Sequence, residues 1–143
     1  MEFVASQEER FMGKGTTAVD IKAALAGKTV LRGRTPYTSE ADAEAAFATL
    51  AEFSGGGIFA GSFSGESPWE RHLNGDELVH ILDGGTTLTI IIDDEQQVFE
   101  MSGGMLVVVP QGCWHRFHSK EGVTVLTMTP QPTEHTTKED PRS

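Results

Sequence analysis

The sequence contains a single cysteine, Cys113, which excludes an intrachain disulfide framework. Positive charge is also scarce, because 11 Lys and Arg residues face 21 Asp and Glu residues, for a formal net charge of −10. A chain this acidic repels phosphates, so nucleic acids and anionic membrane surfaces are poor partners. No apolar run has the length of a signal peptide or a membrane span. We therefore expect a cytoplasmic protein without a nucleic-acid or membrane partner.

Glycine, in contrast, is abundant, with 16 residues among 143. Frequent glycine is typical of the many tight turns of an all-β fold, and this chain length suits one domain with a real core. We predict an N-terminal arm with short helices at 1–45, a β-barrel domain at 46–129 and a flexible, proline-bearing C-terminal tail at 130–143.

Local patterns refine this division. Residues 1–17 look like a loose arm, and helix patterns cover 17–27 and 38–45, with a short edge strand at 29–31 between them. A hairpin around the turn at 54–57 opens the β domain. Seven short strands separated by turn residues follow and predict a sandwich or a closed barrel, at 69–73, 77–82, 86–92, 96–101, 105–109, 113–118 and 123–129.

Four of the five histidines lie between residues 72 and 118, and two of them stand in spaced patterns with a carboxylate. Residues two apart in a strand share a face, so Glu70 and His72 point the same way, and the turn after His72 returns Glu77 beside it. In a closed barrel these three side chains and His115 form the inward set. Two imidazoles with one or two carboxylates can hold a divalent metal and leave positions open for substrate or dioxygen.

The remaining polar and aromatic candidates have simpler interpretations. By strand parity His80 and His118 belong to the outer face, and so does Arg71. We expect Trp69 and Trp114 to pack structurally near the barrel mouth and Cys113 to act as a small apolar filler. His135 lies in the predicted tail, where no pattern indicates a function.

The two histidine segments resemble the paired motifs of the cupin superfamily. His72, Glu77 and Gly84 fit the second half of the first motif, with four and six intervening residues. In the second motif, Gly104, Pro110, Gly112 and His115 stand at the expected spacings. The resemblance covers roughly residues 45–129. It implies a jelly-roll β-barrel with a divalent metal inside, Fe, Mn, Ni or Zn, and often a homodimer.

The chain departs from these motifs most clearly at Glu70, which stands where the first histidine is usual. Ser64 replaces the opening glycine, and Ser119 replaces the final asparagine. Glu70 leaves two alternatives open. The metal is held by two Glu and two His, or by His72, Glu77 and His115 alone. In the second case Glu70 is free to act as a catalytic base or to orient substrate.

The leading functional hypothesis is a metal-dependent enzyme acting on a small molecule. Dioxygenase-like oxidation is the first expectation, and isomerase or lyase chemistry on a sugar or organic acid is the next. The alternative from a different class is a non-catalytic module that binds a small molecule or a metal. The fold alone does not decide between them, because one fold hosts many chemistries.

Overall fold

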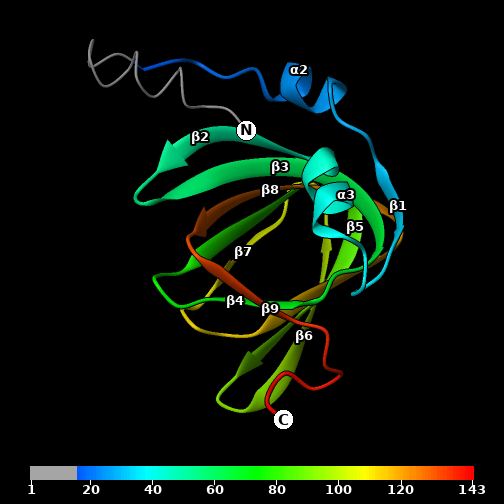
Figure 1. Cartoon of the computed structure of the whole chain (residues 1–143), viewed down its shortest axis with the longest axis vertical. Coiled ribbons are helices and arrows are strands. Elements are labelled where there is room, and N and C mark those ends of the chain that lie inside the picture. The colour runs from blue at the N-terminus through cyan, green and yellow to red at the C-terminus, as the bar shows by residue number, and fades with distance from the viewer. Residues whose placement is uncertain (1–15) are drawn as a thin grey trace.

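The computed structural model describes residues 16–143, which are mostly β-strand (Figure 1). The loose arm expected at 1–17 lies, apart from its last two residues, outside the described part. In chain order the elements are α2 (Ile21–Ala26), β1 (Leu31–Arg34), α3 (Glu40–Ala46), β2 (Phe47–Phe53), β3 (Gly56–Glu66), β4 (Trp69–His72), β5 (Glu77–Ile92), β6 (Glu95–Ser102), β7 (Leu106–Val109), β8 (His115–Pro130) and β9 (Thr133–Thr136).

The strands form one curled nine-stranded sheet, in which β1, β3, β8, β4 and β9 are consecutive neighbours. β2 continues the sheet beyond β3, and β5 pairs with β6, β7 and β8. All of these pairs are antiparallel except β1 with β3. The predicted all-β fold is confirmed, and so is the predicted hairpin, which is β2 and β3.

β5 and β8 are each twice as long as predicted. The strands expected at 77–82 and 86–92 are one strand, and β8 covers most of those expected at 113–118 and 123–129. The reason lies at two facing glycines, Gly84 with φ 77° and Gly122 with φ 128°. A Cβ on Gly84 would overlap the backbone of Gly122. The glycines bend the two strands around the barrel corner without ending them.

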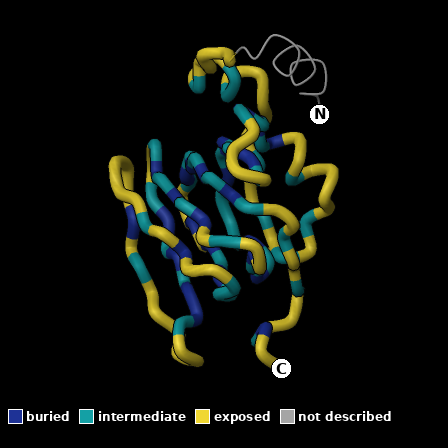
Figure 2. Tube along the Cα trace, turned by 90° about the vertical axis from the view of Figure 1, so that its left-hand side faces the viewer, coloured by how far each residue is buried: buried dark blue, intermediate teal, exposed yellow. Residues whose placement is uncertain are grey.

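The core follows the alternation of the strands, and Figure 2 shows buried residues along them and exposed ones mainly in the turns. The main cluster contains Phe63, Val79, Ile81, Leu88, Ile90, Met101, Val109, Phe117, Val123 and Val125. A smaller cluster of Ala48, Leu50 and Ala60 lies beneath the apolar side of α2. Burial of these side chains, at about 25 cal/mol per Å² of apolar surface, drives the closure of the sheet.

The N-terminal helices begin at side-chain caps. The Asp20 carboxylate accepts a hydrogen bond from the Ala23 amide, and the Ser39 hydroxyl accepts one from the Asp42 amide. The helix predicted for 17–27 is therefore confined to Ile21–Ala26. The edge strand expected at 29–31 lies slightly later, at Leu31–Arg34, because it pairs with β3 there.

The expectation of a frayed tail at 130–143 is wrong for its first half. β9 pairs with β4 along its whole length, from Trp69 opposite Thr136 to His72 opposite Thr133. The Trp69 indole also donates to the carbonyl of Glu139. These bonds satisfy the edge of β4 and repay the entropy of ordering a polar segment. The C-terminal strand consequently borders the site described next.

Candidate metal centre

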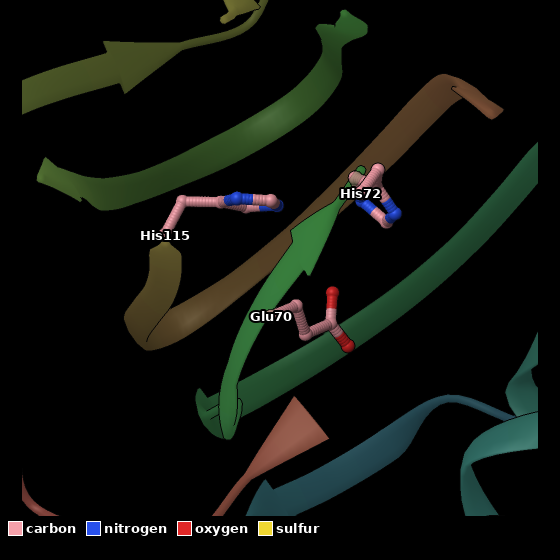
Figure 3. Close-up of side chains that lie close together, drawn as sticks. All are labelled: Glu70, His72 and His115. Atoms are coloured by element: carbon pink, nitrogen blue, oxygen red, sulfur yellow. The ribbon is translucent and has the colours of Figure 1, made fainter. Parts of the chain in front are cut away.

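Four side chains of the predicted inward set meet at one end of the barrel. Glu70 and His72 come from β4, Glu77 begins β5 and His115 begins β8, where its Cα pairs with that of Glu70. Figure 3 shows Glu70, His72 and His115 directed toward a common space. Each offers a ligand atom, and these atoms lie within 4.8 Å of one another.

Hydrogen bonds between two loops bring the histidine segments together. The Gln111 side-chain amide donates to the Leu73 carbonyl, and the Gln111 backbone amide donates to the Asp76 carboxylate. The Gly112 amide donates to the carbonyl of His72 at 2.9 Å. The turn after His72 and the turn before His115 thus form one bonded unit, which fixes the separation of the two imidazoles.

Glu77 lies between the two imidazoles. Its Oε1 is 3.0 Å from His115 Nε2 and 3.4 Å from His72 Nε2. All three residues are at most 5% exposed. Ligands held about 2.1 Å from a metal are about 3.0 Å apart at a right angle and about 3.4 Å apart at the tetrahedral angle. Glu77 Oε1 therefore lies at a distance from each imidazole nitrogen that is found between two ligands of one ion.

These three atoms are also the ones without a hydrogen bond. His72 Nε2, His115 Nε2 and Glu77 Oε1 are buried, and within residues 16–143 none has a partner in hydrogen-bonding geometry. Three buried, unsatisfied polar atoms cost several kcal/mol in total, at about 1–3 kcal/mol each. Their convergence on one point indicates that a cation fits there.

The other ring nitrogen of each histidine and the other carboxylate oxygen of Glu77 are each hydrogen-bonded to a neighbouring group. His115 Nδ1 lies 3.0 Å from the Cys113 carbonyl, and because a carbonyl only accepts, Nδ1 carries the hydrogen. In neutral His115 the lone pair is then on Nε2, facing Glu77. His72 Nδ1 bonds the Thr133 hydroxyl at 3.0 Å, and the Thr129 hydroxyl donates to Glu77 Oε2 at 2.7 Å. Such outer contacts orient metal ligands.

The acid–base properties follow from the same contacts. Burial raises the pKa of Glu77, but the neighbouring His115 and His72 outweigh burial and lower the pKa to about 2. Burial lowers the pKa of His115, and its proximity to Glu77 and Glu70 outweighs this and raises the pKa. Glu77 is thus anionic at neutral pH, and any proton that His115 carries on Nε2 must leave before a metal binds there.

Glu70 is less buried than the other three, with 19% of its side chain exposed. Its Oε2 lies 3.1 Å from His135 Nε2, a contact that raises the pKa of His135. Burial raises the pKa of Glu70, but His135, His115 and Arg34 together lower it. No sequence pattern indicated a function for His135, and the pairing of β9 with β4 places it beside Glu70.

A cavity of about 420 Å³ opens onto the site. Its apolar wall is formed by four phenylalanines, Phe47, Phe59, Phe63 and Phe117. Arg34, Thr133 and His135 also line it. Sequence reasoning missed these three because they come from the N-terminal strand and from the presumed tail. Strand parity could have indicated His135 only if the pairing of β9 with β4 had been anticipated.

The residues expected on the outside are found there. His118 is 58% exposed by its side chain, at 3.8 Å from Glu66, and Arg71 pairs with Glu134 and stacks over Trp114. Trp69, as expected for structural packing, is buried. Cys113 packs against the main core cluster, and burial, Asp93 and Asp76 raise the pKa of its thiol.

Residues 63–129 match the family described as Cupin domain, a segment that contains Glu70, His72, Glu77 and His115. The curled sheet also resembles a cupin superfamily protein from Desulfitobacterium hafniense DCB-2, with a TM-score of 0.52, 23% identity and coverage of 60% of this chain and 76% of that one. The chain carries a cupin domain. Its jelly-roll β fold is the one that the sequence motifs predict.

Two further relatives are dioxygenases. An acireductone dioxygenase of Rhodopseudomonas palustris (strain TIE-1) is 41% identical over 49 residues, which are 34% of this chain. The match covers 29% of that relative, so the chain spans less than a third of its length. The hydroquinone 1,2-dioxygenase PnpCD, in complex with Cd²⁺ and 4-hydroxybenzonitrile, matches with a TM-score of 0.51 and 16% identity, over 59% of this chain and 63% of that chain.

None of the helices in residues 16–143 has the length and apolar character of a bilayer-crossing segment.

Proposed function

We propose that this cupin domain binds one divalent transition metal through His72, Glu77 and His115, and that it is a dioxygenase-like enzyme acting on a small molecule. The observation that carries the proposal is the meeting of three buried, hydrogen-bond-free ligand atoms at 3.0 and 3.4 Å. Two imidazoles with one carboxylate and open positions are the ligand set of non-haem Fe(II) oxygenases, although Mn, Ni and Zn accept the same donors.

A metal in this site would supply Lewis acidity and open positions for substrate or dioxygen. The surrounding side chains would then bind the substrate and orient it. Glu70 lies beside the site with one carboxylate oxygen occupied by His135 and the other facing the histidines. Because Glu70 is anionic, its free oxygen can accept a proton from a substrate hydroxyl. We therefore assign Glu70 to the substrate and not to the metal.

The local similarity to a dioxygenase supports the choice of oxidation. The acireductone dioxygenase match covers a short segment and leaves the substrate open, and the hydroquinone dioxygenase match is one of fold and does not decide the reaction. A cytoplasmic location and a homodimer stay predictions from the sequence.

Metal reconstitution tests the site. The purified protein is incubated without oxygen with Fe²⁺, Mn²⁺, Ni²⁺ or Zn²⁺, desalted and analysed for metal content. We expect about one equivalent in the wild type and in H118A, whose histidine lies outside the site, and loss of binding in H115A and E77Q. Less than about a tenth of an equivalent in the wild type with every metal, or full occupancy in H115A, would refute the site.

Oxygen uptake tests the reaction. The Fe²⁺ protein is assayed in an oxygen electrode with a panel of catechols, hydroquinones and enediols. E70Q should keep its metal and lose turnover. If E70Q loses its metal instead, Glu70 is a ligand. If the metal-loaded wild type consumes no oxygen with any compound, the domain is better described as a binding module.

A further inference from the structure

Among residues 16–143, Arg34 is the only lysine or arginine that lines the cavity. It is the last residue of β1, and its Cα pairs with Gly65 of β3. A Cβ on Gly65, which has φ 101°, would overlap the backbone of Arg34. The absence of a side chain at Gly65 thus allows β1 to bring a cation to the cavity that Glu70 and His72 also line.

The guanidinium of Arg34 lies against aromatic rings instead of an acid. Its Cζ is 4.9 Å from the centroid of Phe63 and 5.8 Å from that of Phe47. Among the described residues, no ion pair or hydrogen bond engages it, and its buried Nε has no partner. Burial lowers its pKa despite the nearby charge of Glu70. Stacking on one face leaves the in-plane N–H groups of an arginine available to a ligand.

The buried charges show which sign of ligand the cavity favours. A divalent metal contributes +2, Glu70 and Glu77 contribute −2, and Arg34 adds +1, so the loaded interior carries an excess of one positive charge. Glu40 and Glu44 also line the cavity, but both are exposed on α3. A single bound anion would neutralise the interior, whereas an uncompensated buried charge is costly.

We propose that Arg34 binds the carboxylate of a small organic acid whose apolar body lies against the phenylalanine wall and whose other end faces the metal site. This proposal rests on the proposed metal centre. A planar guanidinium forms two parallel hydrogen bonds to a carboxylate, a geometry that lysine cannot reproduce. Arg34 would thus determine specificity, and it lies outside the segment that matches the cupin family.

The test uses the full chain reconstituted with zinc, which is redox-inert. Ligand-observed NMR measures the binding of benzoate, phenylacetate and isovalerate, each beside its neutral primary amide. The variants are R34Q, R34K and R32Q, in which Arg32 is an exposed arginine of the same strand that does not line this cavity. Circular dichroism verifies folding, and zinc content is measured for every sample.

We expect at least one carboxylate to bind more tightly than its amide. R34Q should weaken that carboxylate about 10- to 100-fold, the effect of losing charge-assisted hydrogen bonds, and R34K should restore part of it. R32Q should match the wild type, and amide binding should not change. Equal binding of acid and amide, no binding of any acid, or no effect of R34Q in a zinc-loaded protein would overturn this proposal alone. A wild type that takes up no zinc would instead refute the metal centre.

Discussion

The hydroxyl of Thr129 offers a sharp test of how this site is built. Thr129 is buried, at 8% exposure, and donates to Glu77 Oε2 at 2.7 Å. Its Oγ1 also lies 2.8 Å from the Thr127 hydroxyl. Because the single hydrogen of Thr129 is directed to Glu77, Thr127 must be the donor in that pair. Two hydroxyls thus form a short chain that ends on the carboxylate between the histidines.

Thr129→Val removes this hydroxyl at almost constant volume. A hydrogen bond to a charged group contributes about 1.5–3 kcal/mol, so the metal-free variant should lose a free energy of unfolding in that range. Loss of an outer contact to a ligand typically weakens metal binding about 10- to 100-fold. Both effects should appear together, because the same bond stabilises Glu77 and orients it.

Thr124→Val is the matched control. Thr124 lies on the same strand, and its hydroxyl is 2.7 Å from that of Ser62, away from the site. T124V should cost about 1 kcal/mol of stability, the contribution of a neutral hydrogen bond, without changing metal affinity. Urea unfolding of the metal-free proteins gives the stability, and competition with a chromogenic chelator gives the metal dissociation constant.

One result would refute this reasoning. If T129V binds metal within about threefold of the wild type, a difference below about 1 kcal/mol, then Thr129 does not orient a ligand. The position of Glu77 Oε1 between the imidazoles would then not depend on this hydrogen bond.

Two further predictions concern the backbone and protons. Gly65→Ala should destabilise the protein by several kcal/mol more than Gly104→Ala in thermal unfolding. Both glycines have positive φ, 101° and 95°, but only Gly65 faces another backbone. Equal losses of stability would contradict the close approach of β1 to Gly65. Metal affinity should rise with pH, because the raised pKa of His115 keeps a proton bound below that pKa and the metal must displace it. Calorimetry in buffers of different ionisation enthalpy should show that metal binding releases protons and that this release grows as the pH falls, and affinity that does not change with pH would contradict this assignment.

The sequence predicted the inward set well because strand parity is a local property. Glu70, His72, Glu77 and His115 all come from segments whose alternation and turns are readable over a few residues. The same reasoning placed His118 and Arg71 outside. What parity could not decide was the role of Glu70, which depends on a contact with His135 from another strand.

The errors have a common physical origin in long-range pairing. Glycines such as Gly84 predict a turn from local preference, yet here they bend a continuous strand, because Gly122 of the partner bends at the same place. The tail is polar and carries prolines, which indicates disorder until the unpaired edge of β4 is known. Local composition carries no information on which edge is free.

The residues around the site come from two parts of the chain, the barrel segment and the strands at the edges of the sheet. The four side chains of the inward set all lie in 63–129, the segment that matches the cupin family. The groups that complete the surroundings come from outside it: Arg34 from β1, and Thr133 and His135 from β9. In the proposed site the barrel would thus supply the metal ligands, and the two edge strands would supply groups around the substrate.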